Sequence, residues 1–286
     1  MTGYAIGLVG LDMDGTLLNS QHEISPFTQR VLEQVLEKGC EIVPATGRPL
    51  GGVPASLLEL PGVRYAITAN GASVVQLPSG EFLRRAWLER AQVLQVLEVC
   101  RGLYASYDVF LNGWGYTQRS AMERVEEWAP RGMVDYIRAS RRQVEDSMEF
   151  IHQQDTLEKV TLFFQREENR VKARRLLEAV SGLCVTSSLE NNLEINAENA
   201  TKGAALLWLA EHLGLKASQV MACGDSENDV SMLTAAGVGV AMGNARPAIQ
   251  QQADVCTDTN DGDGVAKALL HFVLEAPQPE IHRVTG

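Results

Sequence analysis

An apolar stretch that ends in two aspartates constrains the fold of this chain more than any other feature. Residues 6–10 have the continuous apolar character of a strand buried in a parallel sheet. They run directly into Leu11-Asp12-Met13-Asp14-Gly15-Thr16. Carboxylates at the edge of a hydrophobic core are costly unless a cation, hydrogen-bond donors or a chemical role compensates them. An Asp-Gly turn or a helix cap explains one aspartate, but the whole run after a strand indicates a functional site.

The first and last thirds of the sequence alternate between strand and helix patterns. Ser25 and Pro26 are typical of the N-cap and first residue of a helix, and Gly39 is typical of its end. Such alternation predicts an α/β fold with a Rossmann-like, doubly wound parallel sheet covered by helices on both faces. The expected strands of this sheet cover residues 6–11, 40–45, 64–68, 219–223, 238–242 and 253–257.

The middle of the chain has a different character and predicts a second, inserted α/β domain. We expect strands over residues 109–111, 160–164 and 183–186, with amphipathic helices over 91–100 and 166–180. No run of carboxylates comparable to those at either end occurs there. We therefore expect the inserted domain to span residues 85–190. Residues 1–84 and 191–286 would then fold together as one discontinuous core domain.

Polar residues follow four of the expected core strands. Because the carboxyl ends of parallel strands meet along one edge of a sheet, Asp12 and Asp225 can share a site despite their distance in sequence. Two carboxylates about 4 Å apart repel by roughly 4 kcal/mol at an effective dielectric near 20, and a divalent cation removes that cost. Oxygen ligands without His or Cys favour Mg²⁺ over zinc. The four clusters are Asp12/Asp14, Thr46-Gly47-Arg48, Asn70-Gly71 and Gly224-Asp225-Ser226-Glu227-Asn228-Asp229.

These clusters resemble the ordered motifs of the haloacid dehalogenase-like (HAD) superfamily of hydrolases. The chain is similar in particular to the Cof-like phosphatase group, whose α/β cap domain is inserted between the second and third motifs. The resemblance covers nearly the whole core, and the cap matches in position and composition. It rests on Asp12-x-Asp14-Gly15-Thr16, Thr46-Gly47-Arg48, Lys202, Gly224-Asp225-x-x-Asn228-Asp229, Asn70-Gly71-Ala72, Ala241-Met242-Gly243-Asn244-Ala245 and Asp261-Gly262-Asp263-Gly264-Val265.

The resemblance implies a Mg²⁺-dependent phosphatase of small phosphate monoesters, such as sugar phosphates or phosphorylated cofactors. Asp12 would be the nucleophile that becomes an aspartyl phosphate, and Asp14 the general acid and then the general base. Mg²⁺ would be held by Asp12, by the backbone carbonyl of Asp14 and by Asp225. The implied substrate- and phosphate-binding residues are Thr46, Gly47, Arg48, Lys202 and Asn228, with Asp229 and Asn70 in support.

Several of these residues also have plain structural interpretations. Lys202 would equally suit a solvated position near a helix start, and Thr46-Gly47 a simple strand-to-helix turn. Asp229 would also suit a helix N-cap, and Arg48 a structural pair with acidic residues. Two groups of residues in the cap have two interpretations each: they face the leaving group, or they face solvent. These groups are Trp114, Tyr116 and Arg119, and the basic cluster Arg138, Arg141 and Arg142.

Composition excludes several classes of function. The 286 residues carry a net charge of −11, which argues against general binding to nucleic acid or to an anionic membrane surface. No leader peptide and no apolar stretch of about 18 residues is found, which excludes a membrane ion pump. The five scattered cysteines suggest a reducing compartment. We therefore expect a soluble cytoplasmic protein that acts on a small phosphorylated metabolite. Nothing in the sequence specifies an oligomeric state.

Two alternatives to a phosphatase stay open. A phosphomutase shares the core chemistry but returns the phosphoryl group to the substrate, so it would respond to a bisphosphate activator and release little phosphate. A non-catalytic binding or regulatory protein on the same fold has no need for Asp14, which speaks against that alternative. A dehalogenase is disfavoured because its chemistry needs neither the second aspartate nor a metal.

Overall fold

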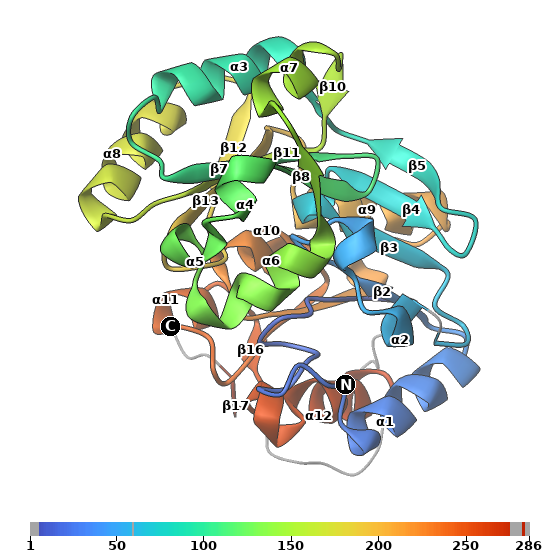
Figure 1. The fold of residues 1–286 in the computed structure, drawn as a ribbon. Coiled ribbons are helices and arrows are strands. Elements are labelled where there is room, and N and C mark those ends of the chain that lie inside the picture. The colour runs from blue at the N-terminus through green and yellow to red at the C-terminus, as the bar shows by residue number, and fades with distance from the viewer. Residues whose placement is uncertain (1–5, 59, 275–281, 284–286) are drawn as a thin grey trace.

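A parallel sheet forms the centre of the core domain, as the sequence predicted (Figure 1). The computed structural model describes residues 6–58, 60–274 and 282–283. The strand order is β17-β16-β15-β14-β1-β2, and every neighbouring pair is parallel except β16 with β17. The strands are β1 (Leu8–Leu11), β2 (Glu41–Pro44), β14 (Val220–Gly224), β15 (Val238–Ala241), β16 (Val255–Cys256) and β17 (His282–Arg283).

Helices cover both faces of this sheet because its strands are apolar on both sides. In β1, Val9 and Leu11 join the cluster under helices α1 and α12, whereas Leu8 joins the cluster under α9 and α10. Successive side chains of a strand point to opposite faces, so a strand buried on both sides is apolar throughout. The core helices are α1 (Pro26–Glu37), α2 (Ala55–Leu58), α9 (Lys202–His212), α10 (Val230–Ala235), α11 (Pro247–Gln250) and α12 (Gly264–Phe272).

A small antiparallel sheet extends the core beyond β2. It consists of β3 (Tyr65–Thr68), β4 (Ser73–Gln76) and β5 (Glu81–Arg85). A parallel bridge between Ala45 and Ile67 joins β3 to the end of β2. The strand expected over residues 64–68 of the parallel sheet is therefore a strand of this antiparallel sheet, joined to the end of β2 by one bridge. The residues after it still reach the same sheet edge.

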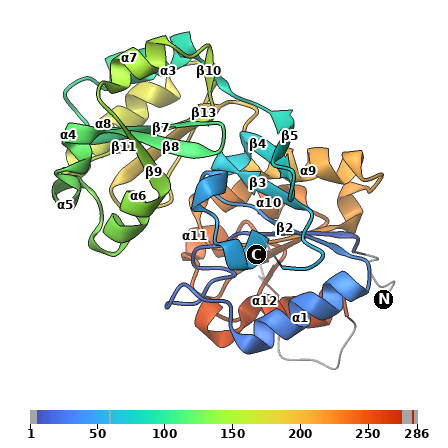
Figure 2. The ribbon, with the colours of Figure 1, turned by 45° about the vertical axis from the view of Figure 1, so that its right-hand side comes forward.

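The inserted domain is built on a second six-stranded sheet, which Figure 2 shows lying above the core domain. Its order is β12-β13-β11-β7-β8-β9, and only β8 with β9 is parallel. The strands are β7 (Ser106–Leu111), β8 (Trp114–Gln118), β9 (Arg141–Val144), β11 (Lys159–Phe163), β12 (Leu183–Thr186) and β13 (Asn192–Ala197), and β6 (Leu88–Glu89) pairs with β10 (Thr156–Leu157).

Helices α3 and α8 pack on the face of the second sheet that is turned away from the core (Figure 1). Val160 and Leu162 of β11 point into this apolar layer, so the alternate residues of the strand point toward the core domain. The helices of the inserted domain are α3 (Arg90–Val99), α4 (Arg119–Met122), α5 (Val125–Trp128), α6 (Val134–Ser140), α7 (Ser147–His152) and α8 (Glu167–Glu178).

The boundary between the domains differs from the expected residue 190. Strand β13 pairs with both β11 and β12, so residues 192–197 lie in the second sheet and not in the core. The sequence Asn-Leu-Glu-Ile-Asn-Ala alternates polar and apolar residues as a strand does. Its polar residues face the core domain, and in the sequence they are typical of a segment that connects two domains. Because Arg85 is the last residue of β5 in the core, we propose residues 86–197 as the inserted domain.

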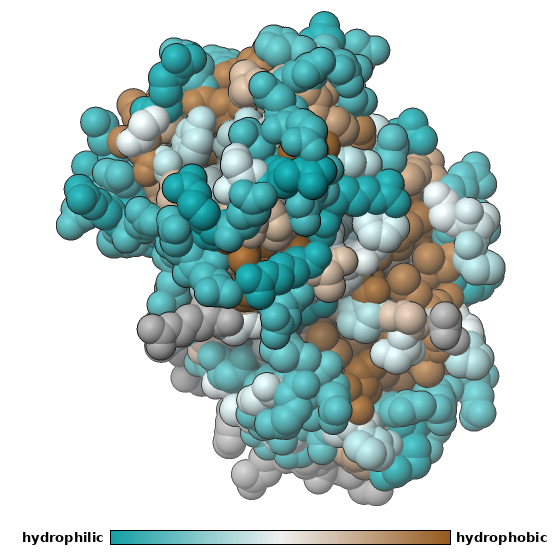
Figure 3. Space-filling view, viewed as in Figure 1, coloured by the Kyte–Doolittle hydropathy of each residue, from teal (hydrophilic) through white to brown (hydrophobic). Residues whose placement is uncertain are grey.

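The outer surface is mostly polar. Figure 3 shows hydrophilic residues over most of one face, with hydrophobic residues concentrated on the right-hand side of the core domain. In the part of the chain that the structure describes, no helix is both long and apolar enough to cross a membrane.

Candidate active site

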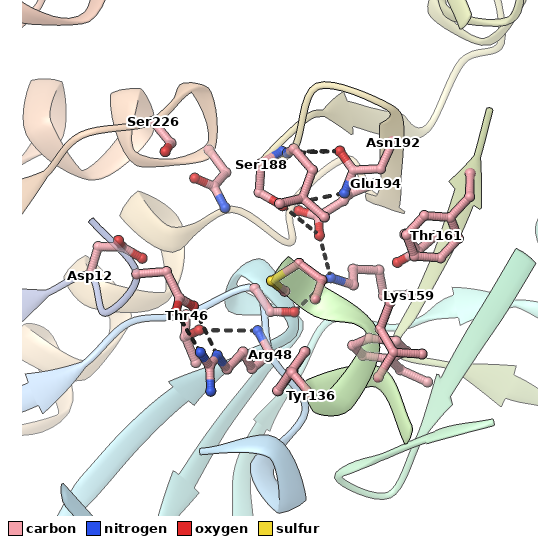
Figure 4. A pocket seen from close by; sticks show the side chains of 18 of the residues that line it. Asp12, Thr46, Arg48, Tyr136, Lys159, Thr161, Ser188, Asn192, Glu194 and Ser226 are labelled. Carbon is pink, nitrogen blue, oxygen red and sulfur yellow. Dashed lines mark hydrogen bonds and ion pairs between the residues drawn. The ribbon is translucent and has the colours of Figure 1, made fainter. Parts of the chain in front are cut away.

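A cavity of about 280 Å³ lies between the core domain and the inserted domain. Figure 4 shows Asp12, Thr46 and Arg48 on one side of it and Lys159 and Thr161 on the other. The first group follows strands β1 and β2, and the second lies on β11. A cavity of this size suits a small ligand.

Lys202 lies at the centre of a buried group of charges beneath this cavity. Thr201 caps α9 by accepting the N–H of Ala204, which places Lys202 in the first turn of the helix. The Lys202 Nζ donates to Asp12 Oδ1 at 2.6 Å and to Asp229 Oδ1 at 2.7 Å. Because the Lys202 side chain is fully buried, its interpretation as a solvated surface lysine is wrong. Burial opposes its charge, but Asp12 and Asp229 raise the pKa of Lys202 above its usual value.

Three carboxylates surround this one lysine. Oxygen atoms of Asp12, Asp225 and Asp229 all lie within 4.8 Å of one another. Burial, followed by the charge of Asp229, raises the pKa of Asp12 well above its usual value and the pKa of Asp225 to about 6. One lysine cannot balance three carboxylates, so the group has an excess of negative charge when all three are ionised. An oxygen-only donor set with an uncompensated charge fits Mg²⁺.

The loop after β14 is held in place by Asp229. Asp229 Oδ2 accepts the backbone N–H groups of Asp225 at 3.0 Å and Ser226 at 2.9 Å. Asp229 thereby completes the capping box of the short helix Glu227–Asp229. It makes no side-chain hydrogen bond as the N-cap of α10, so the N-cap interpretation is wrong. The same side chain also pairs with Lys202. A Cβ on Gly224 would lie 2.4 Å from the Cβ of Asp229, so the packing requires glycine there. Thr16 donates to Asp225 Oδ1 at 2.8 Å and joins this loop to the one after β1.

Arg48 holds the carboxylate of Asp14 through two hydrogen bonds. Its Nε donates to Asp14 Oδ2 at 2.8 Å and its Nη2 to Asp14 Oδ1 at 2.5 Å. The guanidinium also donates to the carbonyl of Gly52 and lies 4.3 Å from the ring centroid of Tyr136 in α6. Arg48 thus pairs with an acidic residue, which was one of its two interpretations, and it also lines the cavity.

The remaining core residues predicted for the site form a connected hydrogen-bond network. Thr46 Oγ1 accepts the N–H of Arg48 at 3.1 Å, and the Nδ2 of Asn228 donates to Asn70 Oδ1 at 3.1 Å. Asn70 has a left-handed backbone (φ 61°) in the short helix Ala69–Gly71. The Oδ1 of Asn228 is buried at the cavity and has no partner among the described residues. A bound ligand would satisfy this oxygen.

Two residues of the inserted domain that sequence analysis missed complete this network. Lys159 on β11 donates to Glu194 on β13 at 2.9 Å and to the carbonyl of Gly47 at 2.6 Å. Glu194 also accepts from Asn70 at 2.8 Å. Burial opposes the charge on both side chains, and Lys159 nevertheless holds the pKa of Glu194 below its usual range. The available signal was polar residues at alternate positions of otherwise apolar strands, as in Lys159-Val-Thr-Leu-Phe163.

Of the two groups considered in the inserted domain, only Arg141 lines the cavity. Its Nε donates to the buried Asp108 at 2.7 Å. Arg119 pairs with Glu145 at the surface, and Arg138 with Glu126. Trp114 lies against Arg142, and Tyr116 stacks on the ring of Phe150. Arg141 is therefore the member of these groups that lies at the cavity, where it is already paired with Asp108.

Comparison with known proteins gives consistent matches along the chain. A profile of haloacid dehalogenase-like hydrolases matches residues 9–269. The chain is 32% identical to Phosphatase YwpJ of Bacillus subtilis, over 93% of this chain and 99% of YwpJ. It is 33% identical to the 5-amino-6-(5-phospho-D-ribitylamino)uracil phosphatase YcsE of the same organism, over 94% and 96% of the two chains. Its fold matches the structure of a haloacid dehalogenase-like hydrolase from B. subtilis with a TM-score of 0.82 and 31% identity, over 94% and 100% of the chains.

Proposed function

The chain belongs to the haloacid dehalogenase-like hydrolase family, and we propose that it is a Mg²⁺-dependent phosphatase of small-molecule phosphate monoesters. The observation that carries this proposal is the buried group of Asp12, Asp225, Asp229 and Lys202 beside the cavity. Phosphoryl transfer depends on positioning and on neutralising charge. This group provides a nucleophile, a cation and a place for a metal ion. YcsE acts on a phosphorylated metabolite according to its name, which supports a substrate of that class.

The first step transfers the phosphoryl group to Asp12. A carboxylate oxygen of Asp12 attacks phosphorus, and the bond between phosphorus and the leaving-group oxygen breaks. Asp14, in its protonated form, gives its proton to that oxygen, so the products are an alcohol and an aspartyl phosphate. Arg48 fixes the position of the Asp14 side chain through two hydrogen bonds. Forming a covalent intermediate divides one difficult hydrolysis into two easier steps.

The second step returns Asp12 to its free form. Asp14 accepts a proton from a water molecule while the water oxygen attacks phosphorus, and the bond between phosphorus and the Asp12 oxygen breaks. Inorganic phosphate leaves, and Asp14 is again protonated. We assign Lys202, Thr46 and Asn228 to holding the phosphoryl oxygens between the two steps, which is supported by the position of Thr46 and Asn228 on the cavity wall and by the contact of Lys202 with Asp12. The contacts of Lys159 and Glu194 with the core join the inserted domain to the core domain at the cavity.

Asp12, Asp225 and the backbone carbonyl of Asp14 would hold the Mg²⁺ ion. One oxygen of Asp229 accepts from the buried Lys202 and the other from two backbone N–H groups. The partners of Asp225 are the hydroxyls of Thr16 and Ser226, which can rotate away when a metal ion binds. We therefore assign Asp229 to the support of the site and not to direct ligation. When bound, Mg²⁺ neutralises negative charge that develops on the phosphoryl oxygens. We also propose a cytoplasmic location, which the five free thiols support.

Phosphate release from a panel of phosphorylated sugars and cofactors tests the proposal. We expect release that requires Mg²⁺ and stops with excess chelator. Folded, Mg²⁺-loaded protein that releases no phosphate from any compound would contradict it. Isomerised substrate formed in the presence of a bisphosphate, with little free phosphate, would replace the phosphatase with a phosphomutase.

A further inference from the structure

Thr161 carries a buried hydroxyl that faces the cavity without a partner. Its side chain is 2% exposed, and Figure 4 shows it across the cavity from Asp12 and Thr46. Among the described residues, the Thr161 hydroxyl makes no hydrogen bond. Thr161 and Asn228 are the two cavity-lining residues with such an atom in the described part of the chain. Asn228 lies on the phosphate side, so Thr161 marks the side of the leaving group.

The other polar side chains on this wall are already engaged with one another. Lys159 bonds to Glu194 and to the core, and Arg141 bonds to Asp108. Asn192 accepts three hydrogen bonds from residues 187–189. A hexose phosphate carries many hydroxyl groups. Several of these hydroxyl groups would be buried against this wall without a hydrogen-bond partner, which costs binding energy.

Aliphatic and aromatic side chains fill the rest of the wall around Thr161. The cavity is lined there by Phe110, Met133, Tyr136, Ile137, Phe163 and Leu189. Its volume of about 280 Å³ is at the lower limit of common ligand pockets, so it suits a phosphate group with one ring. A flat ring buries apolar surface against this wall, and a single polar ring atom is enough to satisfy Thr161.

We propose that Thr161 determines specificity for phosphate monoesters whose leaving group is a single heteroaromatic ring, through a hydrogen bond to one acceptor on that ring. This inference rests on the proposed phosphatase function and names its substrate class. Thr161 touches the leaving group and takes no part in the transfer of the phosphoryl group. Its effect therefore falls on the choice between substrates.

Paired substrates isolate this one hydrogen bond. The three isomers of pyridylmethyl phosphate each differ from benzyl phosphate by a ring nitrogen, so the ratio of their kcat/KM values measures recognition of the acceptor. We expect the wild-type protein to prefer one isomer over benzyl phosphate by roughly tenfold, the value of one neutral hydrogen bond. Thr161→Val should reduce the ratio to near one, and Thr161→Ser should keep it. Thr186→Val is the matched control, because Thr186 has an unpartnered hydroxyl in the same sheet but does not line the cavity.

Two further substrates separate the possible failures. Acetyl phosphate carries no ring, so the absence of its hydrolysis and of all other turnover would overturn the phosphatase function itself. Faster turnover of glucose 6-phosphate than of benzyl phosphate and of all three pyridylmethyl phosphates would overturn the inference and leave the phosphatase function in place. An unchanged pyridyl-to-benzyl ratio in Thr161→Val would also overturn it.

Discussion

Replacing Lys202 with methionine removes the only cation that contacts both Asp12 and Asp229 among the described residues. Oxygens of these two aspartates lie within 4.8 Å of each other. At an effective dielectric near 20, two unit charges at that distance repel by about 3.5 kcal/mol. Removing one partner from a buried ion pair commonly costs about 3–5 kcal/mol. We expect Lys202→Met to lower the free energy of unfolding by that amount near neutral pH, without Mg²⁺.

Denaturant unfolding at several pH values and Mg²⁺ concentrations checks this prediction. The loss should shrink when Mg²⁺ is added. It should also shrink as the pH is lowered from neutral, because burial raises the pKa of Asp12 and the proton that it takes up removes the repulsion. Lys267→Met is the matched control, since Lys267 pairs with Asp258 at the surface and should cost less than about 1 kcal/mol. A loss below about 1 kcal/mol for Lys202→Met at neutral pH would refute the reasoning.

Three further predictions concern catalysis, metal binding and the inserted domain. Asp14→Asn should lower kcat by roughly 10²- to 10⁴-fold with an unchanged circular dichroism spectrum, and substantial residual turnover would count against its acid–base role. The affinity for Mg²⁺, measured by calorimetry, should fall as pH drops through about 6, because burial raises the pKa of Asp225 to about 6 and its protonated form is a poor ligand. An affinity independent of pH would contradict that assignment. Glu194→Gln should lower the free energy of unfolding by about 3 kcal/mol through the loss of its pairing with Lys159, while Glu98→Gln, at an exposed pair with Arg101, should cost less than about 1 kcal/mol. Equal losses in the two variants would contradict a buried ion pair.

The elements of the core were predictable because their signals are local. The continuous apolar run of β1 is buried on both faces, and Ser25 and Pro26 begin α1 as expected. The order of parallel strands then brings Asp12 and Asp225 together at one edge of the sheet. The site residues that follow the core strands could therefore be predicted from the sequence.

The side of the site that comes from the inserted domain was less predictable. Lys159, Thr161 and Glu194 lie on strands, where polar residues usually face solvent, but here they face the core domain. Only the packing of one domain against the other buries them, and that packing depends on contacts between residues far apart in sequence. The same ambiguity displaced the expected domain boundary, because β13 carries polar residues toward the core.

Trapping the covalent intermediate tests the central claim most directly. Protein mixed with Mg²⁺ and a turned-over substrate is quenched in acid, and its peptides are examined by mass spectrometry. We predict a phosphoryl group on Asp12 in the wild-type protein and none in Asp12→Asn, which should also lack turnover. A phosphoryl group on another residue, or sustained turnover by Asp12→Asn, would contradict the account.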